Sequence, residues 1–154
     1  MTTNTLSSKN VVIIGGTAGI GLATAQAAAA LGAEVWAAGR SEAHIENAKK
    51  LSNGSFEIRQ ADTHDAESLE AIFNEVGDID HLVSAAVGGE RTLKPFLEQT
   101  EAQFRAAYDK LWGYAKVVRT GDPYLAKDGA ITLVSGSPAR KIKPAQSALS
   151  CVGA

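Results

Sequence analysis

Four glycines fall within seven residues near the start of the chain, in the run Gly15-Gly16-Thr17-Ala18-Gly19-Ile20-Gly21. In such a run Gly15 permits a tight turn, Gly19 lets the backbone approach a phosphate, and Gly21 lets a helix pack closely against a sheet. Backbone amides at the helix start, with the positive end of its dipole, favour a pyrophosphate. The glycine turn, with Thr17, Ala18 and Ile20 between its glycines, is therefore predicted to bind a dinucleotide. A close-packed turn without a ligand is the alternative.

Arg40 and Ser41 directly follow the second predicted strand. In a dinucleotide-binding fold the residue at this place meets the adenosine ribose. An acidic residue there binds the 2′-hydroxyl of NAD, whereas an arginine accommodates the 2′-phosphate of NADP. The planar guanidinium gives a phosphate two hydrogen bonds, and Ser41 adds a further donor. The pair favours NADP(H) over NAD(H), and an ordinary solvated arginine is the alternative.

Other phosphate sites fit the glycine turn less well. No Gly-Lys-Ser/Thr sequence follows it, which excludes a Walker loop. A flavodoxin-like FMN site is compatible with the same fold, but its loop does not need so many glycines.

Short apolar runs alternate with helical segments along the chain. Strands are predicted at residues 10–14, 34–38, 55–60, 81–84 and 130–134, and helices at 19–31, 42–51 and 65–76. Strands separated by helices form βαβ units. The pattern predicts one α/β domain over residues 1–154, with a Rossmann-like doubly wound parallel sheet.

The longest predicted helix begins at Thr100, which has capping-box spacing with Gln103. It ends before Gly121-Asp122-Pro123, and a turn at Asp128-Gly129 leads to the fifth strand. Its buried face is predicted from apolar residues at helical spacing, namely Phe104, Ala107, Tyr108, Leu111, Ala115 and Val118. A further helix is expected to start near Gln146.

Two more segments match sequence blocks of a known protein family, both in residue type and in their spacing along the chain. Ala61-Asp62-Thr63 follows the third strand, and Asp80-His81-Leu82-Val83-Ser84-Ala85-Ala86 spans the fourth. With the glycine turn, these blocks make the chain resemble the short-chain dehydrogenase/reductase family over its whole length. The resemblance implies that Asp62 bonds the adenine amino group and that Thr63 lies along the same pocket. It also implies that Ala85, Ala86 and Val87 line the ribose and phosphate side.

The chain departs from that family at two places near the cofactor. The family has threonine where this chain has Ile14, and an Asn-Asn-Ala-Gly run where it has Ser84-Ala85-Ala86-Val87. The second change removes a side chain that ties the sheet together. It does not remove the cofactor pocket.

The family's catalytic group is Asn, Ser, Tyr and Lys. By family position, Lys110 stands in the place of the asparagine, while Ser135 and Ser137 flank Gly136 in the place of the serine. A partly desolvated lysine can exchange a proton near neutral pH, and a serine hydroxyl can polarise a carbonyl. A solvated surface lysine and turn serines are the alternatives. The family's Tyr-x-x-x-Lys pair is absent, because residues 146–154 contain neither tyrosine nor lysine.

The amino-acid composition excludes several classes of function. The 154 residues are 45% hydrophobic and 21% charged, as in an ordinary globular domain, and the net charge of −2 gives no basic field for nucleic acid or an anionic membrane. The single cysteine, Cys151, excludes a disulfide framework. His44, His64 and His81 lack ligand spacing and are interpreted as structural or surface residues, so no metal is expected. The uncharged residues 11–33 are interpreted as strand, glycine turn and helix rather than a membrane span.

Taken together, these features predict an NADP(H)-dependent oxidoreductase that transfers hydride between nicotinamide and a small carbonyl or alcohol. The alternative is a catalytically inactive dinucleotide-binding sensor or regulatory protein. The resemblance also implies a homodimer or homotetramer, and no secretory signal is visible, so a cytoplasmic location is expected. A fold of this kind has about six strands. The five predicted here leave the last strand at an exposed edge and imply that the C-terminal part of the fold is missing.

Overall fold

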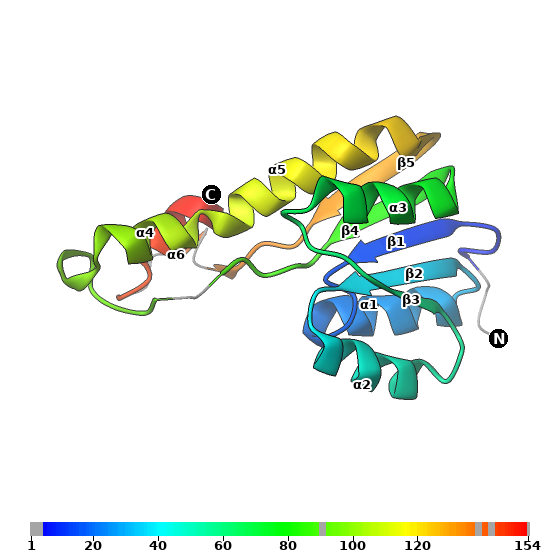
Figure 1. Ribbon diagram of the computed structural model, residues 1–154, viewed down its shortest axis with the longest axis horizontal. Coiled ribbons are helices and arrows are strands. Elements are labelled where there is room, and N and C mark those ends of the chain that lie inside the picture. The colour runs from blue at the N-terminus through cyan, green and yellow to red at the C-terminus, as the bar shows by residue number, and fades with distance from the viewer. Residues whose placement is uncertain (1–4, 90–91, 138–139, 142–143, 154) are drawn as a thin grey trace.

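A single five-stranded parallel sheet organises the computed structural model, which describes residues 5–89, 92–137, 140–141 and 144–153 (Figure 1). The strands are β1 (Asn10–Ile14), β2 (Glu34–Gly39), β3 (Glu57–Gln60), β4 (Ile79–Ser84) and β5 (Leu125–Leu133). Their order is β3-β2-β1-β4-β5, so the chain crosses from one side of β1 to the other between β3 and β4. This is the doubly wound, Rossmann-like arrangement that the sequence predicts.

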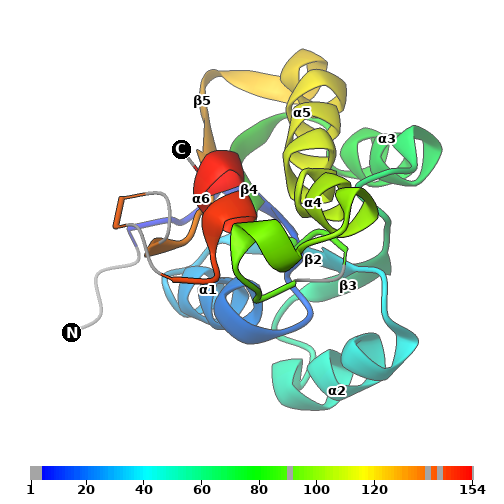
Figure 2. The ribbon, with the colours of Figure 1, turned by 90° about the vertical axis from the view of Figure 1, so that its left-hand side faces the viewer.

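Helices cover both faces of this sheet (Figures 1 and 2). The helices are α1 (Gly19–Ala30), α2 (Glu42–Ser52), α3 (Ala66–Val76), α4 (Glu101–Ala107), α5 (Asp109–Gly121) and α6 (Ser147–Gly153), with short 3-10 turns η1 (Phe96–Glu98) and η2 (Asp122–Tyr124). Residues of α1 and α2 form one buried cluster with the sheet, and residues of α3 and α5 form another. Burial on both faces explains why β1 is apolar without alternation.

The start of the chain folds as predicted. Residues 11–33 form β1, the glycine turn, α1 and the turn into β2. In the part of the chain that the structure describes, no helix is long and apolar enough to cross a membrane. The capping box at Thr100 and Gln103 is present, and Ser41 caps α2 by accepting a hydrogen bond from the His44 amide at 3.4 Å.

The prediction of one long helix from Thr100 is wrong. The segment forms two helices, α4 and α5, which are separated at Tyr108, whose amide donates to the Arg105 carbonyl three residues back. The predicted buried face of the second part is also wrong, because Leu111 is 44% exposed while Gly113, Tyr114, Val117 and Gly121 are buried. The buried face of α5 differs from the prediction because this helix approaches the sheet closely. A Cβ at Gly121 would overlap the Leu82 side chain, so a glycine at this position lets the helix lie close to β4.

Strand β5 is longer than predicted and begins at Leu125 rather than at residue 130. Its pairing with β4 shifts register between Ile79 and His81, which leaves the predicted turn residues Asp128 and Gly129 in the irregular part of the strand. As expected, β5 lies at the edge of the sheet. Beyond the carboxyl ends of the strands, α4 and α6 lie side by side (Figures 1 and 2).

Candidate functional site

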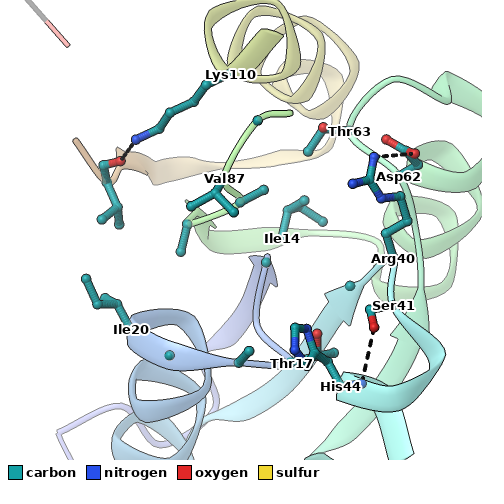
Figure 3. Close-up of a pocket in the computed structure, with 18 of the residues that line it drawn as sticks. Ile14, Thr17, Ile20, Arg40, Ser41, His44, Asp62, Thr63, Val87 and Lys110 are labelled. Carbon is teal, nitrogen blue, oxygen red and sulfur yellow. Dashed lines mark hydrogen bonds and ion pairs between the residues drawn. The ribbon is translucent and has the colours of Figure 1, made fainter. Parts of the chain in front are cut away.

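A cavity of about 540 Å³ opens at the carboxyl ends of the strands, where β1 and β4 lie next to each other (Figure 3). Ligands of open parallel sheets bind at this place, because the loops leaving the two strands run in opposite directions. The lining includes Ile14, Gly15, Thr17, Ala18, Gly19, Ile20, Arg40, Ser41, Asp62, Thr63, Ala85, Ala86, Val87, Lys110 and Ser135. Segments far apart in the sequence therefore share one cavity.

The glycine turn forms one wall of the cavity. The amides of Gly15 and Gly16 both donate to the Ala38 carbonyl at 2.8 Å, and Gly15 has a φ of +85°. A Cβ at Gly15 would overlap the Ala86 backbone, so only glycine lets this turn meet the loop after β4. Gly21 is not a lining residue. A Cβ there would overlap the Gly15 carbonyl, so Gly21 lets α1 start directly against the turn.

The start of α1 faces the same cavity. Its N-cap residue, Ala18, makes no side-chain cap, and the first turn contains no acidic residue. At Gly19, whose φ is +52°, no described atom lies within 4 Å of the Cβ position. Open space beside backbone amides and an uncompensated positive helix end fit a phosphate group of a bound nucleotide.

Arg40 and Asp62 form an ion pair at another side of the cavity, with 3.4 Å between the Arg40 Nη1 and Asp62 Oδ2 atoms (Figure 3). Partial burial raises the pKa of Asp62, but hydrogen bonding from the His64 amide and the charge of Arg40 outweigh it, so the pKa lies below its ordinary value. Asp62 is therefore an ionised acceptor at neutral pH. Two-thirds of the Arg40 side chain is exposed to solvent.

Lys110 projects from the first turn of α5 and meets the segment that leaves β5 (Figure 3). Its Nζ donates to the Val134 carbonyl at 2.9 Å and lies 5.0 Å from the centre of the Tyr114 ring. The buried Tyr114 hydroxyl donates to the same carbonyl. These contacts hold the ammonium group at the wall of the cavity beside Ser135.

Lys110 and Ser135 both line the cavity, whereas Ser137 does not. Both serines are exposed, and the Ser137 carbonyl accepts the amides of Arg140 and Lys141. Of the two serines predicted from the family position, only Ser135 therefore lines the cavity.

Sequence reasoning missed three polar lining side chains, those of His44, His64 and Asp109. His44 lies in the first turn of α2, just after Ser41, and His64 follows Thr63 in the turn after β3. Both histidines are close in sequence to predicted binding residues, which is the signal that could have identified them. No group of three metal-ligating side chains occurs within the described ranges.

The departure at Ser84 has a structural consequence. Its side chain is fully buried, and among the described residues its hydroxyl has no hydrogen-bond partner. Ser84 therefore does not replace the side chain that, by resemblance, ties the sheet together at this position.

Known proteins of one family are similar to this chain. The family model described as short chain dehydrogenase matches residues 9–151. The chain is 34% identical over 104 residues to L-xylulose reductase of Homo sapiens, a match that covers 68% of this chain and 41% of that protein. A dehydrogenase/reductase from Sinorhizobium meliloti 1021 superposes with a TM-score of 0.80 at 25% identity, covering 99% of this chain and 64% of that one.

A further solved structure carries a nucleotide. It is a protein of Escherichia coli CFT073, assigned as a short chain dehydrogenase and complexed with NADPH. It has a TM-score of 0.82 at 17% identity and covers 98% of this chain and 68% of its own. This likeness concerns the fold. The chain spans about two-fifths of the human relative and just under two-thirds of the Sinorhizobium protein.

Proposed function

Because this chain belongs to the short chain dehydrogenase family, we propose that it is an NADP(H)-dependent oxidoreductase. It transfers hydride between the nicotinamide ring and a small carbonyl or alcohol substrate. One observation carries this proposal. A single cavity at the β1–β4 crossover is lined by the glycine turn, by Arg40 and by Lys110, so the groups proposed to bind phosphate and to donate a proton would face one ligand.

Arg40, Ser41, Asp62 and Thr63 hold the adenosine end of the cofactor. Arg40 turns from Asp62 to the 2′-phosphate, for which its planar guanidinium supplies two hydrogen bonds. The Ser41 hydroxyl caps α2 with its oxygen and keeps its hydrogen for the same phosphate. Asp62, ionised at neutral pH, accepts a hydrogen bond from the adenine amino group. NAD(H), which lacks the 2′-phosphate, loses the contacts with Arg40 and Ser41 and binds more weakly.

The glycine turn and the loop after β4 hold the middle of the cofactor. The backbone of Thr17, Ala18, Gly19 and Ile20 at the start of α1 would hold the pyrophosphate, because amides and the helix dipole complement its charge. Ala85, Ala86 and Val87, which line the same cavity, would contact the ribose. Small side chains there leave the cavity open for the sugar.

Lys110 and Ser135 act at the reaction end. When bound, the cofactor supplies or accepts the hydride. Lys110 donates a proton to the substrate oxygen during carbonyl reduction and takes it back during alcohol oxidation. Its hydrogen bond to Val134 fixes the ammonium group for this transfer. Ser135 donates a hydrogen bond to the same substrate oxygen. The human relative is named a reductase, which supports reduction as the working direction.

The proposed oxidoreductase function also carries proposals about the substrate, the assembly and the location of the whole protein. We propose a small-molecule substrate, assembly into a homodimer or homotetramer, and action in the cytoplasm. Sedimentation velocity measures the assembly directly, and a monomer at all concentrations tested contradicts that part of the proposal.

The test of the proposed function has two steps. NADPH fluorescence is titrated with the protein, and the complex is then screened for carbonyl-dependent oxidation over a panel of aldehydes, ketones and ketosugars. Binding followed by oxidation of at least one carbonyl is the expected result. Binding without oxidation across the panel supports the inactive sensor instead, and absence of binding overturns both.

A further inference from the structure

A contact between a histidine and an aspartate inside the cavity joins two segments that are far apart in the sequence. His64, in the turn after β3, places its Nε2 atom 3.0 Å from Oδ1 of Asp109, the first residue of α5. The other ring nitrogen of His64 lies 3.2 Å from the Thr63 hydroxyl and 3.4 Å from Oδ1 of Asp62. His64 therefore stands between the carboxylate next to Arg40 and the carboxylate next to Lys110.

Asp109 continues this chain of contacts to the loop after β4. Its second oxygen, Oδ2, accepts the amide of Gly89 at 2.9 Å. The same loop touches the start of α5 at Gly88, where a Cβ would overlap the Lys110 amide. The carboxylate of Asp109 thus fixes the loop that contains Val87 and the first turn of the helix that carries Lys110.

Other contacts keep α5 in place without the His64 side chain. Lys116 Nζ donates to the main-chain carbonyl of His64 at 2.7 Å. A Cβ at Gly113 would come within 2.8 Å of the Thr63 hydroxyl, so a glycine lets α5 lie directly on this turn. Removing the His64 imidazole should therefore leave α5 packed against the turn after β3. The His64–Asp109 pair is itself 37% and 39% exposed, and pairs so exposed add little to the free energy of folding.

We infer that His64 and Asp109 are positioning residues that couple the adenosine end of the cavity to its reaction end. Contacts run from Arg40 through Asp62, His64 and Asp109 to the Gly89 amide. A ligand that moves Arg40 or Asp62 shifts His64, and His64 shifts the carboxylate that sets the loop and the first turn of α5. The structural coupling is independent of the proposed function, and its effect on turnover rests on that function.

The coupling is tested first in the ligand-free protein, by the exchange rate of the Gly89 amide in NMR spectra. His64→Ala should speed this exchange about threefold or more, although His64 does not touch Gly89, because Asp109 loses the group that orients it. His64→Gln, whose side-chain amide can still donate to Asp109, should restore most of the protection. His44→Ala, a matched change at a lining histidine outside the chain of contacts, should leave it unchanged. Wild-type exchange in His64→Ala overturns the inference, as does an Asp109→Ala variant without effect.

The consequence for turnover is measured on the same variants. His64→Ala should lower kcat about tenfold with little change in the KM for NADPH, while adenosine 2′,5′-bisphosphate inhibits as in the wild type. The double variant with Asp109→Ala should be no slower than the slower single variant, because both break one connection. Effects of the two changes that multiply overturn the coupling. If the wild type binds no NADPH, the proposed function fails, and the Gly89 measurement still decides the coupling.

Discussion

The adenosine end and the reaction end of the cavity rest on different parts of the sheet. The glycine turn and Arg40 follow β1 and β2, which lie inside the sheet, and the turn is tied by two amide hydrogen bonds to the Ala38 carbonyl. Asp62 and Thr63 follow β3, at the opposite edge from β5. The reaction end leaves β5, an edge strand with no fully buried residue, and Ser135 is exposed. Side chains of α5 hold the reaction end in place, because Lys110 and Tyr114 both donate hydrogen bonds to the Val134 carbonyl.

The two ends of the cavity should therefore respond differently to amino-acid substitutions. Backbone geometry sets the glycine turn beside the adenosine end, because Gly15, Gly16 and Gly21 admit no side chain without overlap. Side-chain contacts set the reaction end, so single side-chain changes there should alter chemistry while the fold survives.

Gly21→Ala should have the largest effect. The new Cβ overlaps the Gly15 carbonyl, so the turn must move, and we expect the free energy of unfolding to fall by about 3 kcal/mol, with loss of NADPH binding. Urea denaturation and NADPH titration measure the two effects. Gly54→Ala is the control. At its φ of +76° the side chain is strained but meets open space, so it should cost about 1 kcal/mol and spare binding. Wild-type stability and affinity in Gly21→Ala would contradict the backbone argument.

Lys110→Ala should act on turnover alone. Loss of the proposed proton donor is expected to lower kcat by about 100-fold or more, with NADPH affinity near the wild-type value. Steady-state kinetics and NADPH titration separate the two quantities. Lys127→Ala removes an exposed lysine of β5 and serves as the matched control. Turnover that survives in Lys110→Ala removes this residue from the mechanism.

Arg40→Asp should reverse the cofactor preference. The substitution removes the cation for the 2′-phosphate and places a second carboxylate beside Asp62, so NADPH affinity should fall about 10- to 100-fold relative to NADH. Titrations with both cofactors give the ratio. Arg119→Asp, an exposed position on α5, controls for the change in net charge. An unchanged ratio means that the 2′-phosphate lies elsewhere.

Asp80→Asn should have the smallest effect, and only on the pH dependence of stability. Lys9 donates to Asp80 at 2.7 Å and the Asn10 amide donates at 2.9 Å, and both hold the pKa of Asp80 below its usual range. A carboxylate with a lowered folded-state pKa stabilises the fold above its ordinary pKa and loses that contribution as pH falls through the folded-state value. We expect about 1 kcal/mol of the acid-induced loss to disappear in Asp80→Asn. Denaturation curves between neutral pH and strong acid measure it, and an unchanged slope contradicts the role of Asp80.

The inner strands and the glycine turn could be predicted because their sequence signals are local. The run from Val11 to Ile14 is buried on both faces, and Gly15, Gly16 and Gly21 stand where the backbone has no room for a side chain. The break at Tyr108 gave no such signal, since the flanking residues favour a helix on either side. The buried face of α5 was missed because glycines make its closest contact, whereas apolar periodicity points to larger residues.

The residues of the candidate site also differ in whether the sequence predicts their positions. Arg40 and Asp62 each follow a strand whose end is visible in the sequence, and their meeting follows from the strand order. The pairing of His64 with Asp109 depends on how closely α5 lies on the turn after β3, which no local pattern encodes. The lining position of Ser135 and the outward position of Ser137 depend on the path of the chain after an edge strand.

Calorimetric titration of the wild-type protein with NADPH and with NADH tests the central claim most directly. A cavity that holds a phosphorylated dinucleotide predicts one binding site per chain and an affinity for NADPH at least about tenfold tighter than for NADH. No heat of binding with either cofactor, or equal affinities for the two, would contradict the assignment of this cavity to NADP(H).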